Sequence, residues 1–174
     1  MYRSPISHQN NYYCIKHLEQ SFKQLTWTES GQVHTYSIRI RFSDHCYSTE
    51  DGIDQVGDDC FICDRGKNNR VFCPARHECS RHLPDIINDL FVKPTQSLRI
   101  THERNGFVYR LKLPSGMNAN EKYYCFIRLQ KSDYYSPCDK NPKLDMYIES
   151  AYPRVMPPAA KERVMFGRHA YNIS

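Results

Sequence analysis

The run CFICDRGKNNRVFCPARHECSRH, residues 60–82, gathers side chains that bind metal ions. It holds four of the chain's eight cysteines and two of its eight histidines. Cys60 and Cys63 are separated by two residues, a spacing at which one loop presents two thiolates to a tetrahedral ion. Cys73, His77, Cys79 and His82 follow within one short stretch. We therefore expect a structural zinc ion bound by Cys60, Cys63 and Cys73, with His77 or Cys79 as the fourth ligand.

The cysteines also allow two other interpretations. Cys73 lies in the apolar run VFC and is equally typical of a buried free thiol. An even number of cysteines permits disulfides in an oxidising compartment. The segment after Met1 has no hydrophobic stretch of the kind that secretory signals contain, and no apolar run approaches the roughly 20 residues of a membrane helix. We therefore expect a cytoplasmic protein with reduced thiols and no membrane contact.

Charge is distributed unevenly along the chain, whose net charge is +5. Between Asp44 and Cys60 there are six acidic residues and no Lys or Arg. Between Phe61 and Lys131 there are thirteen Lys or Arg against six acids. A basic body with one acidic loop favours a polyanionic partner such as RNA or DNA. A merely solvated surface would have the same composition.

Several positions combine residue types that transfer protons or bind phosphate. His45 follows an alternating segment in FSDHCYS, where the end of a strand brings a side chain to the rim of a sheet. Arg81 lies at the expected start of a helix, whose exposed backbone N–H groups attract anions. Ser150 and Tyr152 stand in YIESAYPR, where we expect them to continue the apolar strand face that begins at Leu144.

These residue types suit the cleavage of RNA without a metal ion. The 2′-OH of RNA is the nucleophile, a histidine near its neutral pKa moves the proton, and cations stabilise the phosphorane. We expect His45, Arg81, Ser150 and Tyr152 to form the catalytic site. We also expect contacts to nucleic acid from Arg76, His82, Lys93, Arg110 and Lys112. The chain has no phosphate-binding glycine loop, G-x-S-x-G, H-E-x-x-H or dinucleotide motif.

The elements that must position these residues follow from periodicity. Residues 12–25 place apolar side chains at intervals of three and four, which predicts an amphipathic helix. Residues 33–43 alternate cleanly and predict a strand with one buried face. The acidic stretch 44–70 predicts a long loop. Ser80 is the expected N-cap of a second amphipathic helix that runs to Phe91, with Pro84 in its first turn.

Four further strands are predicted in the second half of the chain, at residues 97–103, 107–113, 123–132 and 144–152. The first two are joined by Arg104-Asn105-Gly106, a strong hairpin signal. The order of elements predicts an α+β fold, in which a mostly antiparallel five-stranded sheet is packed by two amphipathic helices and carries a long cysteine-bearing loop.

The length is that of one domain, which we expect to span residues 1–174. Within it we expect an N-terminal helical region at 1–30, an α+β core at 33–152, and a proline-rich basic tail at 153–174. The tail has at most one short helix, near residues 159–165.

The helix-then-sheet layout and the closing strand LDMYIESAYP resemble the small bacterial toxin-type ribonucleases of the barnase/EndoU/colicin/RelE-like group. The resemblance covers roughly residues 80–152. In many of these proteins a Ser or Thr followed by an aromatic residue on a late strand lies in the active site. Ser150 and Tyr152 match that motif, while His45 and Arg81 match by role. The resemblance implies RNA as the substrate, no cofactor for catalysis, and a neutralising protein partner.

Other functions remain open from the sequence alone. The chain can equally be a non-catalytic nucleic-acid- or protein-binding module stabilised by zinc. It can also be a structural or regulatory α+β protein whose thirteen tyrosines build its core. A divalent-metal nuclease that uses Asp44, Asp54 and Asp58 is a further alternative.

Overall fold

The computed structural model describes residues 4–50, 60–62, 69–102, 105–110, 118–135, 142–155, 159 and 162–174. The first half of the chain contains β1 (Ile6–His8), β2 (Asn11–Tyr13), the 3₁₀ helix η1 (Lys16–Leu18), β3 (Ser21–Glu29), β4 (Gln32–Phe42), the 3₁₀ helix η2 (Asp44–Cys46), β5 (Ser48–Thr49), β6 (Cys60–Ile62) and β7 (Asn69–Phe72). The second half contains α1 (Pro74–Ser80), α2 (Leu83–Val92), β8 (Ser97–His102), β9 (Asn105–Arg110), β10 (Lys122–Lys131), β11 (Leu144–Arg154), β12 (Glu162–Met165) and α3 (Phe166–Ile173).

The main sheet has seven strands in the order β12-β8-β9-β10-β11-β4-β3. Every neighbouring pair is antiparallel except β11 and β4, which run parallel with Leu144 opposite Ile38. The parallel pair joins the N-terminal hairpin β3–β4 to the C-terminal meander. The expected α+β class is therefore confirmed, with two more strands in the main sheet than the five predicted.

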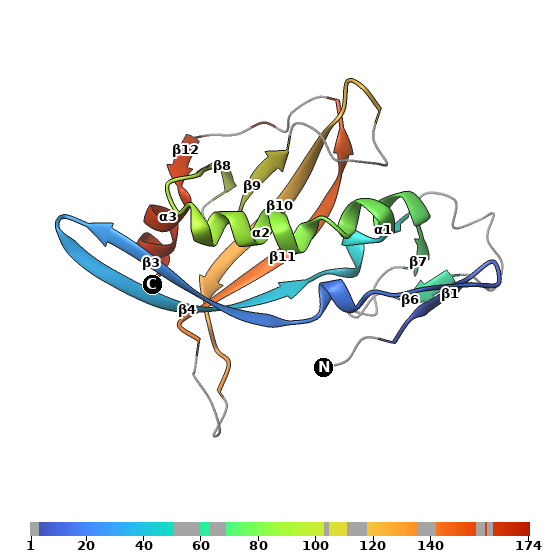
Figure 1. Ribbon diagram of the computed structural model, residues 1–174, viewed down its shortest axis with the longest axis horizontal. Coiled ribbons are helices and arrows are strands. Elements are labelled where there is room, and N and C mark those ends of the chain that lie inside the picture. Colours follow the sequence, from blue (N-terminus) through green and yellow to red (C-terminus); the bar gives the residue numbers. More distant parts are fainter. Residues whose placement is uncertain are drawn as a thin grey trace.

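The helices of the described residues pack on one face of the main sheet (Figure 1). Helix α2 buries Leu83, Ile86, Ile87 and Leu90 in the same core as the inward residues of β4, β10 and β11. The ring of Phe166 in α3 packs edge-on against Phe91 of α2, with 5.5 Å between centroids. No helix among the described residues is long and apolar enough to cross a membrane.

The expected loop at 44–70 contains ordered structure in its described parts. After β4 the chain forms η2 and then β5, which pairs with β7, and β7 in turn pairs with β6. These three short strands form a separate sheet beside the helix α1. Residues 51–59 and 63–68 lie outside the described residues.

The predicted helix at residues 12–25 is wrong. The segment forms β2, η1 and β3, and all nine residues of β3 pair with β4. Leu25 and Trp27 are buried while Phe22 is 46% exposed, so burial follows the two-residue period of a strand. A tight turn with positive φ at Ser30 and Gly31 closes the hairpin. The pairing of β3 with β4 favours a strand more strongly than four apolar residues at helical spacing favour a helix.

Three boundaries also differ from the prediction. Ser80 is not the N-cap of the second helix. It is the last residue of the unpredicted helix α1, where its hydroxyl donates to the carbonyl oxygen of His77 at 2.7 Å. The hairpin β8–β9 is confirmed, but Asn105 already pairs with His102 and belongs to the strand, while Arg104 lies outside the described residues. Within the expected helix near 159–165, residues 162–165 form the strand β12, which is followed by α3.

A β-bulge interrupts β11 and corrects the expected position of two site residues. Ile148 is opposite Ile127, but the next paired residue of β11 is Ser150, opposite Phe126. The extra residue reverses the alternation, so that Ala151 becomes the fully buried side chain. Ser150 and Tyr152 therefore lie on the face away from the helices, and not on the apolar face that begins at Leu144.

The contact between α3 and β3 gives a stability prediction. A Cβ added at Gly167 would lie 2.1 Å from Cε3 of Trp27, so Gly167→Ala forces the helix or the indole ring to move. We expect the unfolding free energy to fall by about 1–3 kcal/mol, as for other overpacked cores. Asn172→Ala, at an exposed position of the same helix, should change it by less than about 0.5 kcal/mol. Urea unfolding followed by circular dichroism measures both variants, and equal midpoints would contradict this packing.

Candidate functional site

His45 is held at the rim of the main sheet by the turn that follows β4. The backbone N–H of Ser43 donates to the carbonyl oxygen of Ile148 at 2.9 Å, which extends the β4–β11 pairing by one residue. The Ser43 hydroxyl then accepts from the backbone N–H of His45 at 3.2 Å and caps η2. The His45 side chain is 40% exposed, and its Nε2 lies 4.0 Å from Oδ1 of Asp44. The position that the sequence predicted for this histidine is the one observed.

Ser48 is the centre of a hydrogen-bond network beside His45. Its hydroxyl donates to the carbonyl oxygen of Asp44 at 2.7 Å and accepts from Nε of Arg70 at 2.8 Å. Arg70 also donates to the Ser48 carbonyl oxygen at 3.1 Å and to the Glu50 carboxylate at 2.5 Å. Arg70 is buried, and its N–H groups are used in these hydrogen bonds, which hold the segment from Ser48 to Glu50 in place.

Arg76 connects this loop to the end of β11. Its Nη1 donates to the carbonyl oxygens of Ser48 at 2.8 Å and His45 at 3.4 Å. The same guanidinium lies 5.1 Å from the ring centroid of Tyr152, within the range of a cation–π contact. Three residues expected from the sequence, His45, Arg76 and Tyr152, therefore meet in one place.

The surroundings of His45 lower its pKa from the usual 6.5. Burial contributes most, because it disfavours the charged imidazolium, and the Arg70 guanidinium lowers the pKa further. The carboxylates of Asp44 and Glu50 raise it, and Arg76 lowers it. The imidazole is therefore neutral at pH 7 and able to accept a proton.

Arg81 is not part of this cluster. It follows the last turn of α1, and its Nη1 lies 3.3 Å from the carboxylate of Glu78. It lines a separate groove of about 710 Å³ between β2, η1 and α1, whose lining residues are Tyr12, Tyr13, Cys14, His17, Pro74, His77, Glu78 and Arg81. Ser150 lies on the side of β11 that faces away from the helices, one residue beyond the bulge.

A Ser–His contact near this groove does not form an activated nucleophile. Nε2 of His17 is 2.8 Å from the buried hydroxyl of Ser80. That hydroxyl donates its only proton to the carbonyl oxygen of His77, so it accepts the proton of His17 and cannot be deprotonated by it.

The other residues expected to bind nucleic acid are dispersed. His82 precedes α2 and is half-buried, and Lys93 follows the same helix and is exposed. Arg110 ends β9, and its side chain is outside the described residues, as is all of Lys112. Among the members of this group whose side chains the structure describes, only Arg76 lies beside His45.

The expected zinc ligands are described only in part. Cys60 begins β6 without a described side chain, and Cys63 lies outside the described residues. Cys73 precedes α1 and has a free thiol. Burial is the main cause that raises the pKa of the Cys79 thiol to about 11. Nε2 of His77 is 3.0 Å from the carbonyl oxygen of Cys14. Within the described part of the chain, no three His, Cys, Asp or Glu side chains are placed to hold a metal ion.

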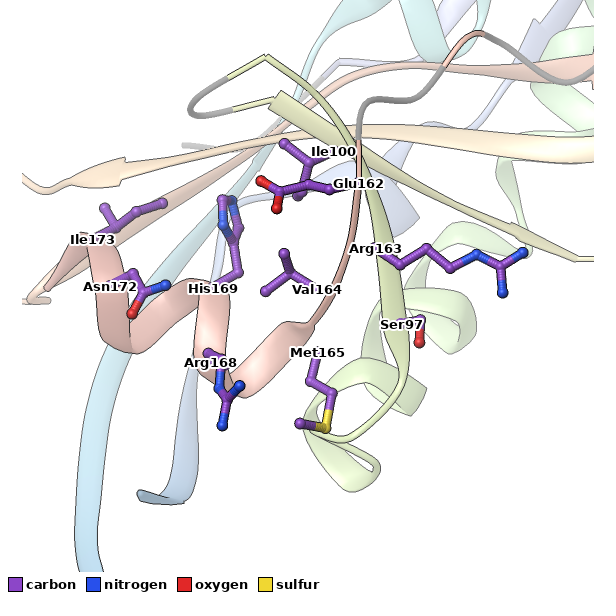
Figure 2. A pocket seen from close by; sticks show the side chains of 10 residues that line it. All are labelled: Ser97, Ile100, Glu162, Arg163, Val164, Met165, Arg168, His169, Asn172 and Ile173. Atoms are coloured by element: carbon purple, nitrogen blue, oxygen red, sulfur yellow. The ribbon is translucent and has the colours of Figure 1, made fainter. Parts of the chain in front are cut away.

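The sequence did not indicate a polar hollow of about 530 Å³ between β8, β12 and α3 (Figure 2). His169 is buried there with its ring toward Glu162 and Ile100, while Arg163 points away. Burial lowers the pKa of His169, and Glu162 opposes that shift. No residue that the sequence selected lies in this hollow, because most of its lining residues come from a segment predicted to be an irregular tail.

The fold and site together define an α+β protein with helices on one sheet face and a histidine–arginine–tyrosine cluster at the sheet's rim. The YjaZ family model matches residues 5–174, and the chain therefore belongs to the YjaZ family. No curated protein and no solved structure matches the chain.

The lowered pKa of His45 predicts a dependence of stability on pH. The unfolded chain takes up this proton near pH 6.5, whereas the folded protein does so only at lower pH. The contribution of His45 to the unfolding free energy is thus present above pH 6.5 and falls as the pH is lowered through the folded pKa. NMR titration of the imidazole should give a pKa below 6.5, and Asp44→Asn should lower it further. A pKa above 6.5 would contradict this environment.

The zinc site remains a prediction of the sequence. Protein purified without chelator should contain about one zinc ion per chain by elemental analysis. Cys63→Ser should remove it, since a structural site needs four ligands, whereas Cys14→Ser, at an exposed thiol, should retain it. Zinc-free protein with unchanged thermal stability would show that the cysteines are free thiols.

Proposed function

We propose that the protein is a metal-independent endoribonuclease whose active site is the cluster of His45, Arg76 and Tyr152. The observation that carries the proposal is the double contact of Arg76. One guanidinium bonds the backbone of His45 and lies against the ring of Tyr152. A proton acceptor, a cation and a phenol are thereby gathered at one exposed rim. This is the set that 2′-OH attack on a phosphodiester needs.

His45 acts as the general base in this proposal. It takes the proton of the 2′-OH, whose oxygen then attacks the adjacent phosphorus. The lowered pKa supports this role, because the base must be unprotonated at neutral pH. The Asp44 carboxylate, 4.0 Å from Nε2, stabilises the imidazolium that forms.

Arg76 supplies positive charge to the phosphorane. All of its hydrogen bonds to described residues come from Nη1, so Nε and Nη2 can donate to a non-bridging phosphate oxygen. Arg70 serves a different purpose, since its donors already bond Ser48 and Glu50 and hold the loop. Arg81 has no part in the chemistry, because it lies in the groove with Glu78.

Tyr152, whose ring lies 5.1 Å from the Arg76 guanidinium, acts as the general acid. The P–O5′ bond breaks as the 2′ oxygen bonds to phosphorus, and the leaving 5′ oxygen takes a proton from the tyrosine hydroxyl. The products are a 2′,3′-cyclic phosphate and a 5′-hydroxyl. His45 releases its proton to solvent and the tyrosine regains one from it, so the cycle needs no oxidant, cofactor or metal ion.

The test is cleavage of RNA by purified protein with and without a chelator. Cleavage should be unaffected by the chelator. His45→Ala should lower kcat by about 10²–10⁴-fold, the usual contribution of a proton-transfer group. Arg76→Ala should lower it by about 10²–10³-fold, as loss of an oxyanion donor does, and Tyr152→Phe should lower kcat while the fold persists.

The controls separate chemistry from folding and from contaminating nuclease. His34→Gln changes a histidine on the helix-covered side of β4, where it stacks on Tyr36, and should retain activity. Each variant should keep the wild-type circular dichroism spectrum. RNA that stays intact with the wild-type protein, or activity that His45→Ala retains, would overturn the proposal.

A further inference from the structure

The face of the main sheet opposite the helices carries a row of arginines and aromatic rings. The alternation of β4 places Arg39 and Arg41 there, since Ile38, Ile40 and Phe42 are in the core. The same alternation places Arg128 on this side of β10 and Tyr147 on this side of β11. Phe22 of β3, opposite Arg39, and Tyr134 after β10 complete it. We call this set of six residues the open face.

The rings and guanidinium groups of the open face are in contact with one another. Arg39 lies 4.4 Å from the ring centroid of Tyr134, which is 5.9 Å from the ring of Phe22. Arg41 and Arg128 lie 5.6 and 5.4 Å from the ring centroid of Tyr147, one from each neighbouring strand. Flat π surfaces of this kind are the platforms on which unpaired bases stack.

Three carboxylates pair with the three arginines of this face, and two of the guanidinium groups remain partly exposed. Asp145 is fully buried and bonded by both Arg39 and Arg41, so one carboxylate serves two guanidinium groups. Glu149 lies 3.3 Å from Arg128, and the exposed Asp133 lies 3.6 Å from Arg39. The side chains of Arg41 and Arg128 are still 39% and 30% exposed. The charges of the open face therefore balance, and the positive net charge of +5 belongs to the chain as a whole. That net charge attracts a polyanion, while the rings of the open face favour one with unpaired bases.

The open face is continuous with the cluster at His45. The bulge in β11 turns Tyr152 to the same side as Phe126, and the two rings stack with 5.3 Å between centroids. The other neighbour of Tyr152 is Arg76. A strand of nucleic acid that lies across the open face therefore extends to the rim at His45.

We infer that the protein binds single-stranded RNA across the open face, with its bases stacked on Phe22 and Tyr134 and its phosphates beside Arg41 and Arg128. The part of this inference that directs the strand toward His45 rests on the proposed function. Duplex RNA is excluded as the preferred ligand, because its base planes are covered by their neighbours.

The test is a binding measurement that does not depend on cleavage. A fluorescent single strand with 2′-O-methyl groups cannot undergo 2′-OH attack, and its Kd is measured by fluorescence anisotropy against that of the matching duplex. Tyr134→Ala and Phe22→Ala should each raise the Kd of the single strand about tenfold, in the range of one lost base stack. Tyr134→Phe, which keeps the ring, should bind as the wild type does. Tyr171→Ala, at an exposed tyrosine on the helix side, is the matched control and should change nothing.

The outcomes separate this inference from the proposed function. If the ring variants weaken binding of the single strand but unmodified RNA stays intact, the proposed cleavage is refuted and the inference that the open face binds RNA is kept. Equal or tighter binding of the duplex would overturn the inference. So would the absence of binding, or binding that Tyr134→Ala and Phe22→Ala do not weaken.

Discussion

The buried ion pair between Arg39 and Asp145 fixes the register of the only parallel contact in the described part of the main sheet. The two residues are direct partners across β4 and β11, and Asp145 also accepts from Arg41 and from the hydroxyl of Ser132. Removal of one partner from such a pair typically costs about 3–5 kcal/mol, because the remaining charge is left buried. A shift by one residue would separate the pair and turn the apolar face of β11 to solvent. The hairpin β3–β4 is therefore held against the C-terminal meander in one position.

The positions of His45 and Tyr152 follow from that register. The pairing of β4 with β11 continues to Ser43, so η2 begins beside the bulge of β11. The bulge then turns Tyr152 toward the rim, and Arg76 joins it to the turn that carries His45. The proposed chemistry thus depends on two irregularities, a 3₁₀ turn and a bulge, at the point where two regular strands stop pairing.

The sequence predicted the parts of the fold that local alternation specifies. The strand at β4, the four later strands and helix α2 were predicted from their apolar periodicity, and His45 was expected at the rim because it follows the alternating residues of β4. The helix predicted at residues 12–25 was wrong because Phe22 was counted as a core residue, whereas it lies on the open face opposite Arg39. The orientation of Tyr152 was beyond prediction, since nothing in YIESAYPR distinguishes a bulged strand from a regular one. Arg81 was selected for a helix start that lies elsewhere, because Ser80 ends one helix instead of beginning the next.

The chemical ends of the cleaved RNA test the central claim most directly. Mass spectrometry of a short oligonucleotide, incubated with purified protein in the presence of chelator, identifies both termini at the cleavage site. Attack by the 2′-OH with His45 as the base predicts a 2′,3′-cyclic phosphate on one fragment and a 5′-hydroxyl on the other. Fragments that end in a 5′-phosphate and a 3′-hydroxyl would show attack by water instead, and an uncut oligonucleotide would show no cleavage. Either result would contradict the mechanism.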